Sequence, residues 1–304
     1  MSEVVVVIVS HNSRGDLERS LPAVGAEDRQ VIVVDNASAD GSAAFVRVRF
    51  PHVKVLELRE NVGYGAACNE GIARTSEALV LLLNPDAWPL GDGIKRLAAC
   101  AERHSASGAL GPRLQAPDGT PQQSFGGVPT RWWLGKPAIT SAPPRPRLPS
   151  LPSPPRSRKF LVGAALLVRR DAFEQVGGFD PSFFMFAEEV DLCWRLQEAG
   201  WGVALCADAT FVHVGGTSTR RDWPAMYREQ LRGHLRLLAK HRDLAEAEAA
   251  RKLLRRALTV RALVARGEQA KALRQAVRWL GSGDATTLLE EGLRPRERPP
   301  DGVA

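Results

Sequence analysis

The chain has 304 residues, a formal net charge of +7 at pH 7, and 44% hydrophobic and 25% charged residues. That length can bury a full core in one large or two small domains, and the composition is typical of a soluble globular protein. The longest apolar runs, residues 4–9 and 161–168, are far below the ~20 residues that cross a bilayer, and no signal-peptide pattern precedes the first run. We therefore expect a cytoplasmic protein whose membrane contact is at most peripheral.

The first strands are predicted from two valine-rich runs, residues 4–9 and 30–34. Each run ends in polar residues, at 10–13 after the first and at 35–38 after the second. A helix is expected between the runs, at 14–24. Strand, helix and strand at this spacing predict a parallel sheet.

A glycine-rich stretch, NVGYGAACNEGIA at 61–73, follows the third expected strand at 53–58. Gly63 and Gly65 allow a tight backbone path, and the helix that follows is expected to point its amide groups toward an anion. Cys68 stands where a dinucleotide fingerprint has its third glycine, and the fingerprint belongs after the first strand, so a Rossmann oxidoreductase or a methyltransferase is disfavoured. A glycine turn of this kind is also commonly structural.

The fourth strand is predicted at 78–83 and ends abruptly in Asn84, Pro85 and Asp86. Pro85 lacks a backbone donor and disfavours helix at Asn84, so the strand should stop and place Asp86 at the carboxyl edge of the sheet, where ligands of open α/β sheets bind. A carboxylate there can hold a divalent cation that neutralises a diphosphate. The alternative is that Asp86 only caps a turn.

The four cysteines show neither a Cys-x-x-Cys pair nor a zinc-ligand spacing: Cys68, Cys100, Cys193 and Cys206. We expect all four to be small core residues with reduced thiols, in a reducing compartment.

A proline-rich segment separates two further expected strands, at 108–114 and 160–169. Residues 137–159 contain eight prolines and several arginines without hydrophobic periodicity. This composition predicts a mobile loop or linker, or less readily a ligand of a proline-binding module. Trp132 and Trp133, just upstream, can stack on a sugar or belong to the core.

Three acidic residues crowd the first turn of a helix expected within 179–201: Glu188, Glu189 and Asp191. They can simply favour the helix N-terminus, and Asp191 can pair with Arg195 four residues on. The functional alternative is that one carboxylate is a general base. His213, on a following apolar strand, is by similar reasoning either a satisfied core histidine or a ligand.

Together these motifs resemble an inverting glycosyltransferase of family 2, which has the α/β GT-A fold, and most closely its rhamnosyltransferase-type branch. The resemblance spans residues 4–218, and the motifs occur in the family's order. Ser10 and Asn12 match the loop that contacts the nucleotide, and Asp35 matches the aspartate that hydrogen-bonds the base. The family's N-x-G-x-G-x-x-x-N stretch is matched by Asn61, Gly63, Gly65 and Asn69.

The resemblance also implies a catalytic apparatus. Asn84 and Asp86 stand where many members have Asp-x-Asp, so Asp86 is left as the anionic metal ligand, and His213 matches a histidine that completes the metal site in some members. Glu189 matches the catalytic base, where relatives usually carry aspartate, and Asp191 is the next candidate. The implied reaction is a single displacement with inversion, in which Mg²⁺ or Mn²⁺ stabilises the leaving nucleoside diphosphate while Glu189 removes the acceptor's hydroxyl proton.

The implied function is transfer of a sugar, rhamnose in that branch, from a nucleoside-diphosphate sugar to a saccharide or lipid-linked saccharide in cell-wall or surface polysaccharide assembly. A nucleotidyltransferase would want a glycine-rich basic loop after the first strand, and residues 10–13 are not one. An inactive nucleotide-sugar-binding scaffold would keep Asp35 and lose the acidic pair, which is present. The sequence names neither sugar nor acceptor, because those contacts lie in variable loops such as 124–134.

Residues 219–304 are expected to form a basic helical extension of a glycosyltransferase domain at 1–218. Fourteen Lys/Arg and five Asp/Glu lie between residues 224 and 280, among apolar residues such as Leu254 and Leu273 at helical spacing. The pattern fits an interfacial helix on the anionic inner face of the plasma membrane, or helices that pack on the catalytic domain or on a second subunit in an oligomer. Nucleic acid is disfavoured, since the second half of the tail has a single tryptophan for stacking.

Overall fold

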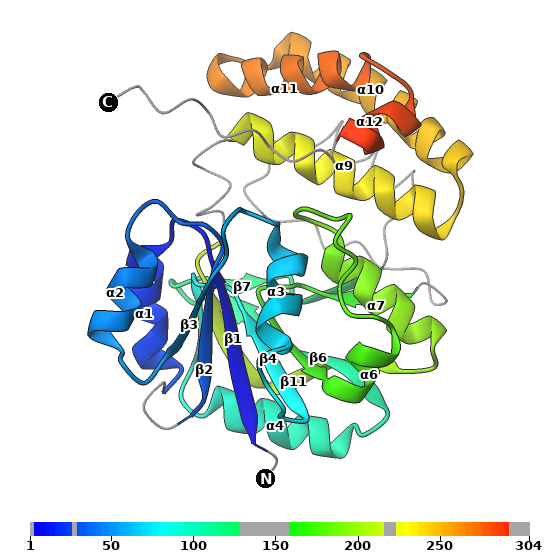
Figure 1. Cartoon of the computed structure of the whole chain (residues 1–304). Helices are drawn as coiled ribbons and strands as arrows, with labels where there is room; N and C mark the ends of the chain where they lie inside the picture. Colours follow the sequence, from blue (N-terminus) through cyan, green and yellow to red (C-terminus); the bar gives the residue numbers. More distant parts are fainter. Residues whose placement is uncertain (1–2, 26–28, 128–157, 216–222, 292–304) are drawn as a thin grey trace. The chain divides into compact units, whose positions relative to one another are not determined.

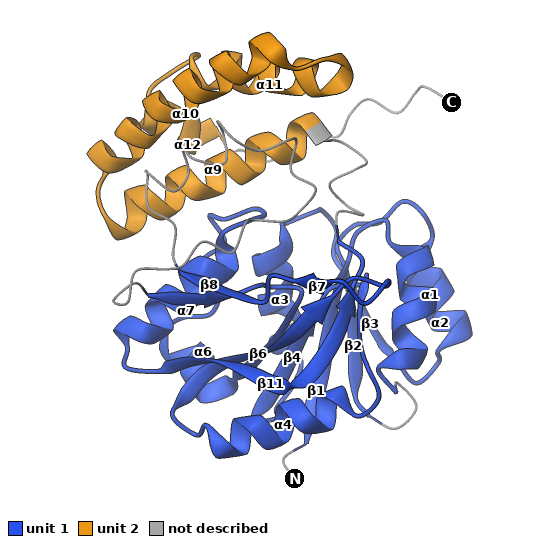
Figure 2. Ribbon diagram, turned by 180° about the vertical axis from the view of Figure 1, so that it is seen from behind, with its two compact units in different colours: residues 1–129, 141–223 blue, residues 130–140, 224–304 orange. Residues whose placement is uncertain are grey.

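The computed structural model describes residues 3–25, 29–127, 158–215 and 223–291 (Figure 1). The chain divides into two compact units, which Figure 2 shows in different colours. Unit 1 comprises Met1–Pro129 and Ser141–Trp223, and unit 2 comprises Thr130–Thr140 and Pro224–Ala304. Trp132, Trp133, most of the proline-rich segment and residues 216–218 of the histidine motif lie outside the described residues.

The N-terminal half of unit 1 is a parallel sheet in the order β3-β2-β1-β4. Its strands are β1 (Val4–Ser10), β2 (Val31–Asp35), β3 (Lys54–Glu57) and β4 (Leu79–Leu83). Every residue of β1, β2 and β4 is buried, as expected for β-branched and leucine-rich strands covered on both faces. The predicted α/β fold class is confirmed, and the polar residues after β1 and β2 lie together because the strands are parallel and in register from Val6–Val31 to Ser10–Asp35.

The sheet continues with mixed strand directions. β10 (Ala165–Arg169) runs antiparallel between β4 and β6 (Ser107–Gln115), and β11 (Gly202–His213) runs parallel to β6. The short strand β5 (Ala87–Pro89) pairs with β11, and β7 (Pro121–Gln122) pairs with β6. β8 (Phe125–Gly127) and β9 (Lys159–Leu161) form a separate two-stranded sheet.

The single strand expected at 160–169 is wrong, because the chain breaks it into β9 and β10 at a turn through Gly163 and Ala164. The backbone groups in this break bond outside both strands. The amide of Val162 donates to Ser124 O at 3.1 Å, and Ala164 O accepts from the amide of Asn84 at 3.0 Å. The break therefore joins the end of β4 to the 124 loop.

Helices cover both faces of the sheet (Figure 1). In unit 1 they are α1 (Arg14–Ala23), α2 (Ser42–Arg49), α3 (Tyr64–Ile72), α4 (Gly93–Arg103), α6 (Arg170–Gln175) and α7 (Glu188–Glu198). On one face Ile8 of β1 shares a core with Leu17 of α1 and Leu97 of α4. On the other face α3 lies so close to β1 that a Cβ on Gly71 would stand 2.4 Å from Val7 Cγ1, so this glycine is required for the packing.

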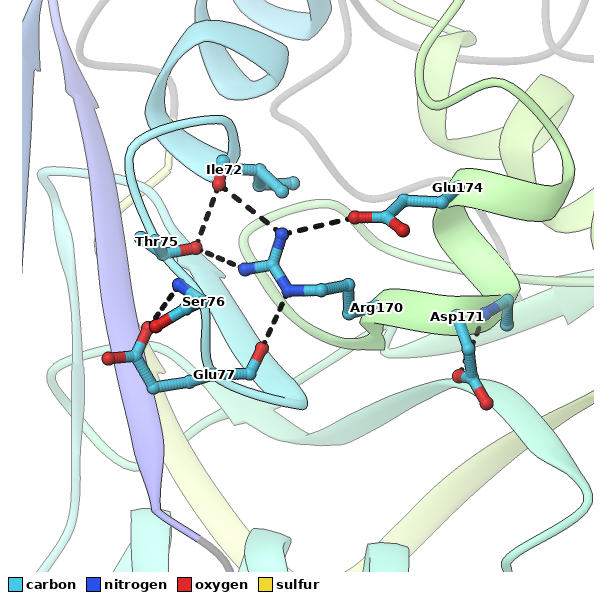
Figure 3. Close-up of polar contacts among 8 residues, drawn as sticks. Ile72, Thr75, Ser76, Glu77, Arg170, Asp171 and Glu174 are labelled. Carbon is cyan, nitrogen blue, oxygen red and sulfur yellow. Dashed lines mark hydrogen bonds and ion pairs between the residues drawn. The ribbon is translucent and has the colours of Figure 1, made fainter.

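Arg170 ties the turn between α3 and β4 to the start of α6 (Figure 3). Its Nε donates to Glu77 O at 2.9 Å, its Nη1 donates to Ile72 O at 3.5 Å, and its Nη2 bonds Thr75 Oγ1. Ile72 ends α3, so the guanidinium also lies at the negative end of the helix dipole. This contact fixes the far end of the helix whose first residues belong to the candidate site.

The expectation of four reduced cysteines is wrong for one pair. Cys100 on α4 and Cys206 on β11 form a disulfide with a Cα–Cα distance of 6.1 Å, whereas Cys68 and Cys193 are free and buried. The two paired residues are 106 positions apart, and the packing of α4 against β11 brings them together, so no local spacing signals the pair. Because Cys100 and Cys206 are paired, these two cysteines do not support the predicted reducing compartment.

Unit 2 consists of α9 (Trp223–His241), α10 (Leu244–Val264), α11 (Gly267–Leu280) and α12 (Ala285–Glu291). The apolar residues at helical spacing are mostly buried, among them Leu254, Leu258 and Leu273, and α10 packs against α11 and α12. Packing of helices on one another therefore accounts for most of that stripe. None of the described helices is both long and apolar enough to cross a membrane.

Candidate active site

The carboxyl ends of β1 and β2 place two polar side chains side by side. Ser10 and Asp35 are buried neighbours in the β1–β2 register. Asp35 Oδ1 accepts from the amide of Ser38 at 2.8 Å, whereas Asp35 Oδ2 and Ser10 Oγ are buried without a hydrogen-bond partner in the described part of the chain. A buried acceptor left open at a strand end is suited to a ligand's N–H donor.

Asn12 joins the two loops that follow these strands. The backbone N–H of Asn12 donates to Ser38 Oγ at 2.9 Å, and the side-chain Oδ1 of Asn12 accepts from the backbone N–H of Ala39 at 2.7 Å. Asn12 and Ala37 both have positive φ, 54° and 60°, which is uncommon outside glycine. Asn12 therefore holds the loop after β1 against the loop after β2, and its predicted role in donor binding stays a prediction.

Asn36, which was not among the predicted site residues, joins the end of β2 to the glycine stretch. Its Nδ2 donates to Asn61 Oδ1 at 2.9 Å and to Gly63 O at 3.2 Å, and its Oδ1 accepts from the amide of Val62 at 3.0 Å. The side chain is buried. Its position next to Asp35 at a strand end was the available signal. Asn36 fixes the start of the glycine stretch against β2.

The glycine stretch holds the loop that carries the acidic residues. Gly63 has φ +89°, and a Cβ at this position would lie 2.3 Å from Phe184 O. The same carbonyl accepts from the amide of Tyr64 at 2.9 Å. The first amide of α3 is therefore used by the protein, contrary to the expectation that it faces an anion. Gly65 is similarly close to Phe179, whose Cβ would lie 3.0 Å from a Cβ there.

Asn69 fastens the other end of that loop. Its Nδ2 donates to Phe179 O at 2.8 Å, and its Oδ1 accepts from the amide of Phe179 at 2.9 Å. Both polar ends of the amide thus bond one backbone residue, so donor binding by Asn69 stays a prediction.

Glu188 and Glu189 open α7 after two residues with left-handed backbone, Phe186 (φ 69°) and Ala187 (φ 70°). One carboxylate oxygen of each glutamate is buried and has no hydrogen-bond partner among the described residues. Burial raises the pKa of Glu189 from 4.5 to about 7. Burial, followed by the negative charge of Glu189, raises the pKa of Glu188 well above its ordinary value. A carboxylate with a pKa near 7 is suited to take a proton at physiological pH.

Asp191 lies on the same helix but faces the protein. Its side chain is 0% exposed, and its Oδ2 accepts from Arg195 Nε at 2.8 Å. Arg195 Nη1 donates a hydrogen bond to Val176 O at 2.6 Å. This arrangement matches the ion-pair alternative, and a catalytic role of Asp191 stays a prediction.

Asp86 and His213 meet where β4 ends and β11 ends. His213 Nε2 lies 3.6 Å from Asp86 Oδ1, and Asp86 Oδ2 accepts from the amide of Gly215 at 3.1 Å. Burial lowers the pKa of His213, against the opposite effect of Asp86, which favours neutral imidazole. A neutral imidazole nitrogen beside a carboxylate oxygen is a donor set that suits Mn²⁺ better than Mg²⁺, and a substrate diphosphate commonly supplies further ligands.

The turn at Gly163 and Ala164 lies between the acidic residues and the end of β4. A Cβ on Gly163 would lie 3.5 Å from Glu189 Cβ, and Gly163 O accepts from Tyr64 Oη at 3.3 Å. Ala164 O holds the amide of Asn84, two residues before Asp86. This turn therefore contacts both the predicted base Glu189 and Asn84, which begins the segment that carries the predicted metal ligand Asp86. Within the described chain, no group of three or more His, Cys, Asp or Glu is arranged to hold a metal by protein ligands alone.

A sequence model described as Glycosyl transferase family 2 matches residues 5–177, which contain β1 to β4, Asp35 and Asp86 but not Glu189 or His213. The chain belongs to this family. A second model, Glycosyl transferase family group 2, matches residues 150–291. The protein is thus a glycosyltransferase, and the family prediction is confirmed.

Two relatives are rhamnosyltransferases. The chain is 37% identical over 246 residues to N-acetylglucosaminyl-diphospho-decaprenol L-rhamnosyltransferase of Mycobacterium tuberculosis, covering 73% of this chain and 80% of that one. It is 34% identical over 85 residues to the rhamnosyltransferase WbbL of Escherichia coli, covering 28% of this chain and 32% of that one.

Solved structures agree on the GT-A fold. The mannosyltransferase PcManGT of Pyrobaculum calidifontis, in complex with GDP-Man and Mn²⁺, superposes with a TM-score of 0.56 at 17% identity, covering 96% of this chain and 84% of that one. TarS of S. aureus with UDP-GlcNAc gives 0.53 at 16% identity, covering 95% and 89%.

Proposed function

We propose that this glycosyltransferase moves rhamnose from a nucleoside-diphosphate sugar to a hydroxyl of a lipid-linked saccharide, in the assembly of cell-wall or surface polysaccharide. The observation that supports the choice of sugar and acceptor is the 37% identity over 246 residues to an enzyme named for rhamnose transfer to N-acetylglucosaminyl-diphospho-decaprenol. The match covers 80% of that relative's length, more than a likeness confined to the donor-binding half would cover.

In the proposed reaction Glu189 is the general base. The acceptor hydroxyl loses its proton to the Glu189 carboxylate as its oxygen bonds the anomeric carbon, and the bond from that carbon to the diphosphate oxygen breaks. Because one displacement takes place, the anomeric configuration inverts. Two observations support this role: one Glu189 oxygen is buried with no hydrogen-bond partner among the described residues, and the pKa of Glu189 is raised to about 7. Ser10 and Asp35, with their open acceptors, are proposed to bind the nucleoside.

Asp86 and His213 are proposed to hold a divalent cation, Mn²⁺ or Mg²⁺, as in the neighbour bound to Mn²⁺. Their donor set fits, since a carboxylate oxygen and an imidazole nitrogen lie 3.6 Å apart, beyond a direct hydrogen bond. When bound, the cation would supply positive charge to the leaving diphosphate. Asn84, which precedes Asp86 at this edge, is proposed to contact the donor.

The test is transfer by the purified full-length protein from a panel of nucleoside-diphosphate sugars to a prenyl-diphosphate N-acetylglucosamine acceptor, with Glu189→Gln as the matched inactive control. Rhamnose transfer in the wild type, with inversion and with loss in the variant, is expected. Transfer of another sugar would overturn the donor assignment, and equal rates in the variant would overturn the base.

We also propose that unit 2 holds the enzyme at an anionic membrane surface beside that acceptor. The end of α10 leaves three apolar side chains in solvent, Val260 at 62%, Leu263 at 80% and Val264 at 80% exposure. Arg256 and Arg266, nearby in sequence, are exposed too. Apolar side chains among basic ones favour an anionic interface, where each basic residue contributes about 1 kcal/mol. We expect the full-length protein to pellet with anionic but not with zwitterionic vesicles, and the Leu263→Glu/Val264→Glu variant to lose this binding. If the wild type does not pellet with anionic vesicles at low salt, the membrane proposal is wrong.

A further inference from the structure

Gln122, a residue without an assigned role, contacts the candidate metal ligand His213 through both ends of its amide. Nε2 of Gln122 donates to the backbone O of His213 at 2.8 Å, and Oε1 of Gln122 lies 3.1 Å from Nδ1 of His213. The two residues are 91 positions apart in sequence, and they come from different strands, β7 and β11.

The sheet fixes where Gln122 can reach. Leu114 of β6 pairs with Gln122 on one side and with Phe211 of β11 on the other. The Gln122 side chain therefore crosses the width of β6 to reach His213 at the end of β11. Both residues of β7 pair with β6, Gln122 with Leu114 and Pro121 with Gln115, so the sheet fixes the backbone position of Gln122.

The hydrogen bonds determine which atoms carry protons. A backbone carbonyl can only accept, so the Gln122 amide nitrogen must face His213 O, and this leaves the amide oxygen facing Nδ1. An amide oxygen can also only accept, so Nδ1 of His213 must carry a proton. In a neutral imidazole Nε2 is then unprotonated, and Nε2 is the atom that faces Asp86 Oδ1 at 3.6 Å.

The alternative tautomer would lose this arrangement. With the proton on Nε2, the lone pair of Nδ1 would face the lone pairs of Gln122 Oε1, and Nε2 could not bind a cation. Nε2 of His213 and Oδ1 of Asp86, both electron-pair donors in this tautomer, thereby face each other at 3.6 Å and can bind one cation together.

We propose that Gln122 is a positioning residue that holds His213 in the Nδ1-protonated tautomer and so presents Nε2, together with Asp86, to a divalent cation. The inference rests on the proposed function insofar as that function assigns Asp86 and His213 to the cation. Partners of this kind behind a metal-bound histidine typically change metal affinity by about 10- to 100-fold.

The test measures Mn²⁺ alone, by electron paramagnetic resonance of the free ion, on full-length wild type, Gln122→Met, His213→Ala and the double variant. Methionine keeps the volume and removes both hydrogen bonds. Gln122→Met should weaken Mn²⁺ binding by about 10-fold in the wild-type background. It should have no further effect once His213 is alanine, because Gln122 acts through that imidazole.

A second readout follows the tautomer itself. In protein labelled with ¹⁵N-histidine, the signals that vanish in His213→Ala should report a protonated Nδ1 in the wild type and a mixture of tautomers in Gln122→Met. A structural role for Gln122 would lower the unfolding midpoint while leaving Mn²⁺ affinity and the tautomer unchanged, and it would overturn the proposal. So would an equal loss of affinity in the His213→Ala background.

The outcomes separate this inference from the proposed function. If Asp86→Asn and His213→Ala weaken Mn²⁺ binding and Gln122→Met does not, the metal site stands and the positioning role is wrong. If neither Asp86→Asn nor His213→Ala changes Mn²⁺ binding, or the wild type binds none, the proposed metal site fails and the role of Gln122 fails with it. Rhamnose transfer is tested independently of both.

Discussion

Replacing Glu189 by glutamine should abolish transfer and at the same time stabilise the protein. The amide keeps the size of the side chain but cannot accept the acceptor's proton, so we expect the transfer rate to fall by about 10²- to 10⁴-fold while donor binding is retained. The gain in stability follows from burial, which raises the pKa of Glu189 from 4.5 to about 7 because the buried carboxylate is costly to ionise.

The gain in stability of Glu189→Gln depends on pH. With the folded pKa above the unfolded one, the folded protein binds more protons between pH 4.5 and about 7, so wild-type stability contributed by Glu189 is lost as pH rises through this window. A tenfold change in acidity corresponds to about 1.4 kcal/mol. Glu189→Gln should therefore be more stable than the wild type by at most about 3 kcal/mol at pH 8, and by nothing near pH 4.

The assay combines chemical denaturation at pH 4, 6 and 8 with the transfer rate over the same range. The wild-type rate should rise with pH and level off above about pH 7, as Glu189 ionises. Asp191→Asn is the matched control: it breaks a buried pair with Arg195 and should cost about 3–5 kcal/mol at neutral pH. If Glu189→Gln transfers sugar within tenfold of the wild-type rate, or if its stability difference from the wild type does not change with pH, the reasoning is refuted.

Three further predictions concern the same unit. Asp86→Ala should weaken Mn²⁺-dependent donor binding more than Asn84→Ala, since Asp86 carries the charge; titration with and without EDTA checks this, and equal binding in EDTA for the wild type would contradict it. Gly63→Ala, whose Cβ would meet Phe184 O at 2.3 Å, should lose transfer. Gly119→Ala is the control: Gly119 has a similar positive φ, and no atom of the described residues lies within 4 Å of a Cβ there, so the change should cost only about 1 kcal/mol of stability. Equal losses in the two variants would refute the role of Gly63 in holding the 179–187 loop. Arg170→Met should lower the free energy of unfolding by about 2–4 kcal/mol. The control Arg96→Met, at an exposed arginine, should lower it by less than about 1 kcal/mol. Equal losses in the two variants would count against the role of Arg170.

The parallel half of the sheet was predictable because its signal is local. The runs that became β1, β2 and β4 are β-branched or leucine-rich and end in polar residues, and a parallel sheet must place such ends at one edge. Ser10, Asp35 and Asp86 follow from that rule. The family resemblance, confirmed by the match over residues 5–177, added the order of the motifs, whereas the roles of the site residues stay predictions.

What the sequence did not reveal depends on contacts between distant residues. Asn36 bonds the 61–63 loop across 25 to 27 positions, Gln122 bonds His213 across 91, and Cys100 joins Cys206 across 106. Such pairs follow no helix or strand period, so they become visible only when the sheet has brought the strands together. The prediction of one strand at 160–169 failed for a related reason, since Val162 and Ala164 form backbone hydrogen bonds with the distant residues Ser124 and Asn84.

The backbone itself shows where folding energy is used for the site. Among the described residues, the non-glycine positions with positive φ are Asn12, Ala37, Phe186 and Ala187. Two lie at the nucleotide edge and two directly precede Glu188. Each such conformation costs of order 1–3 kcal/mol and persists only where its surroundings enforce it. Here the enforcing contacts are the Asn12 bonds to the 38–39 loop and the seating of Phe184 on the glycine stretch. The loop that carries the proposed base Glu189 is thus held, through Phe184, against the glycine stretch that follows β3.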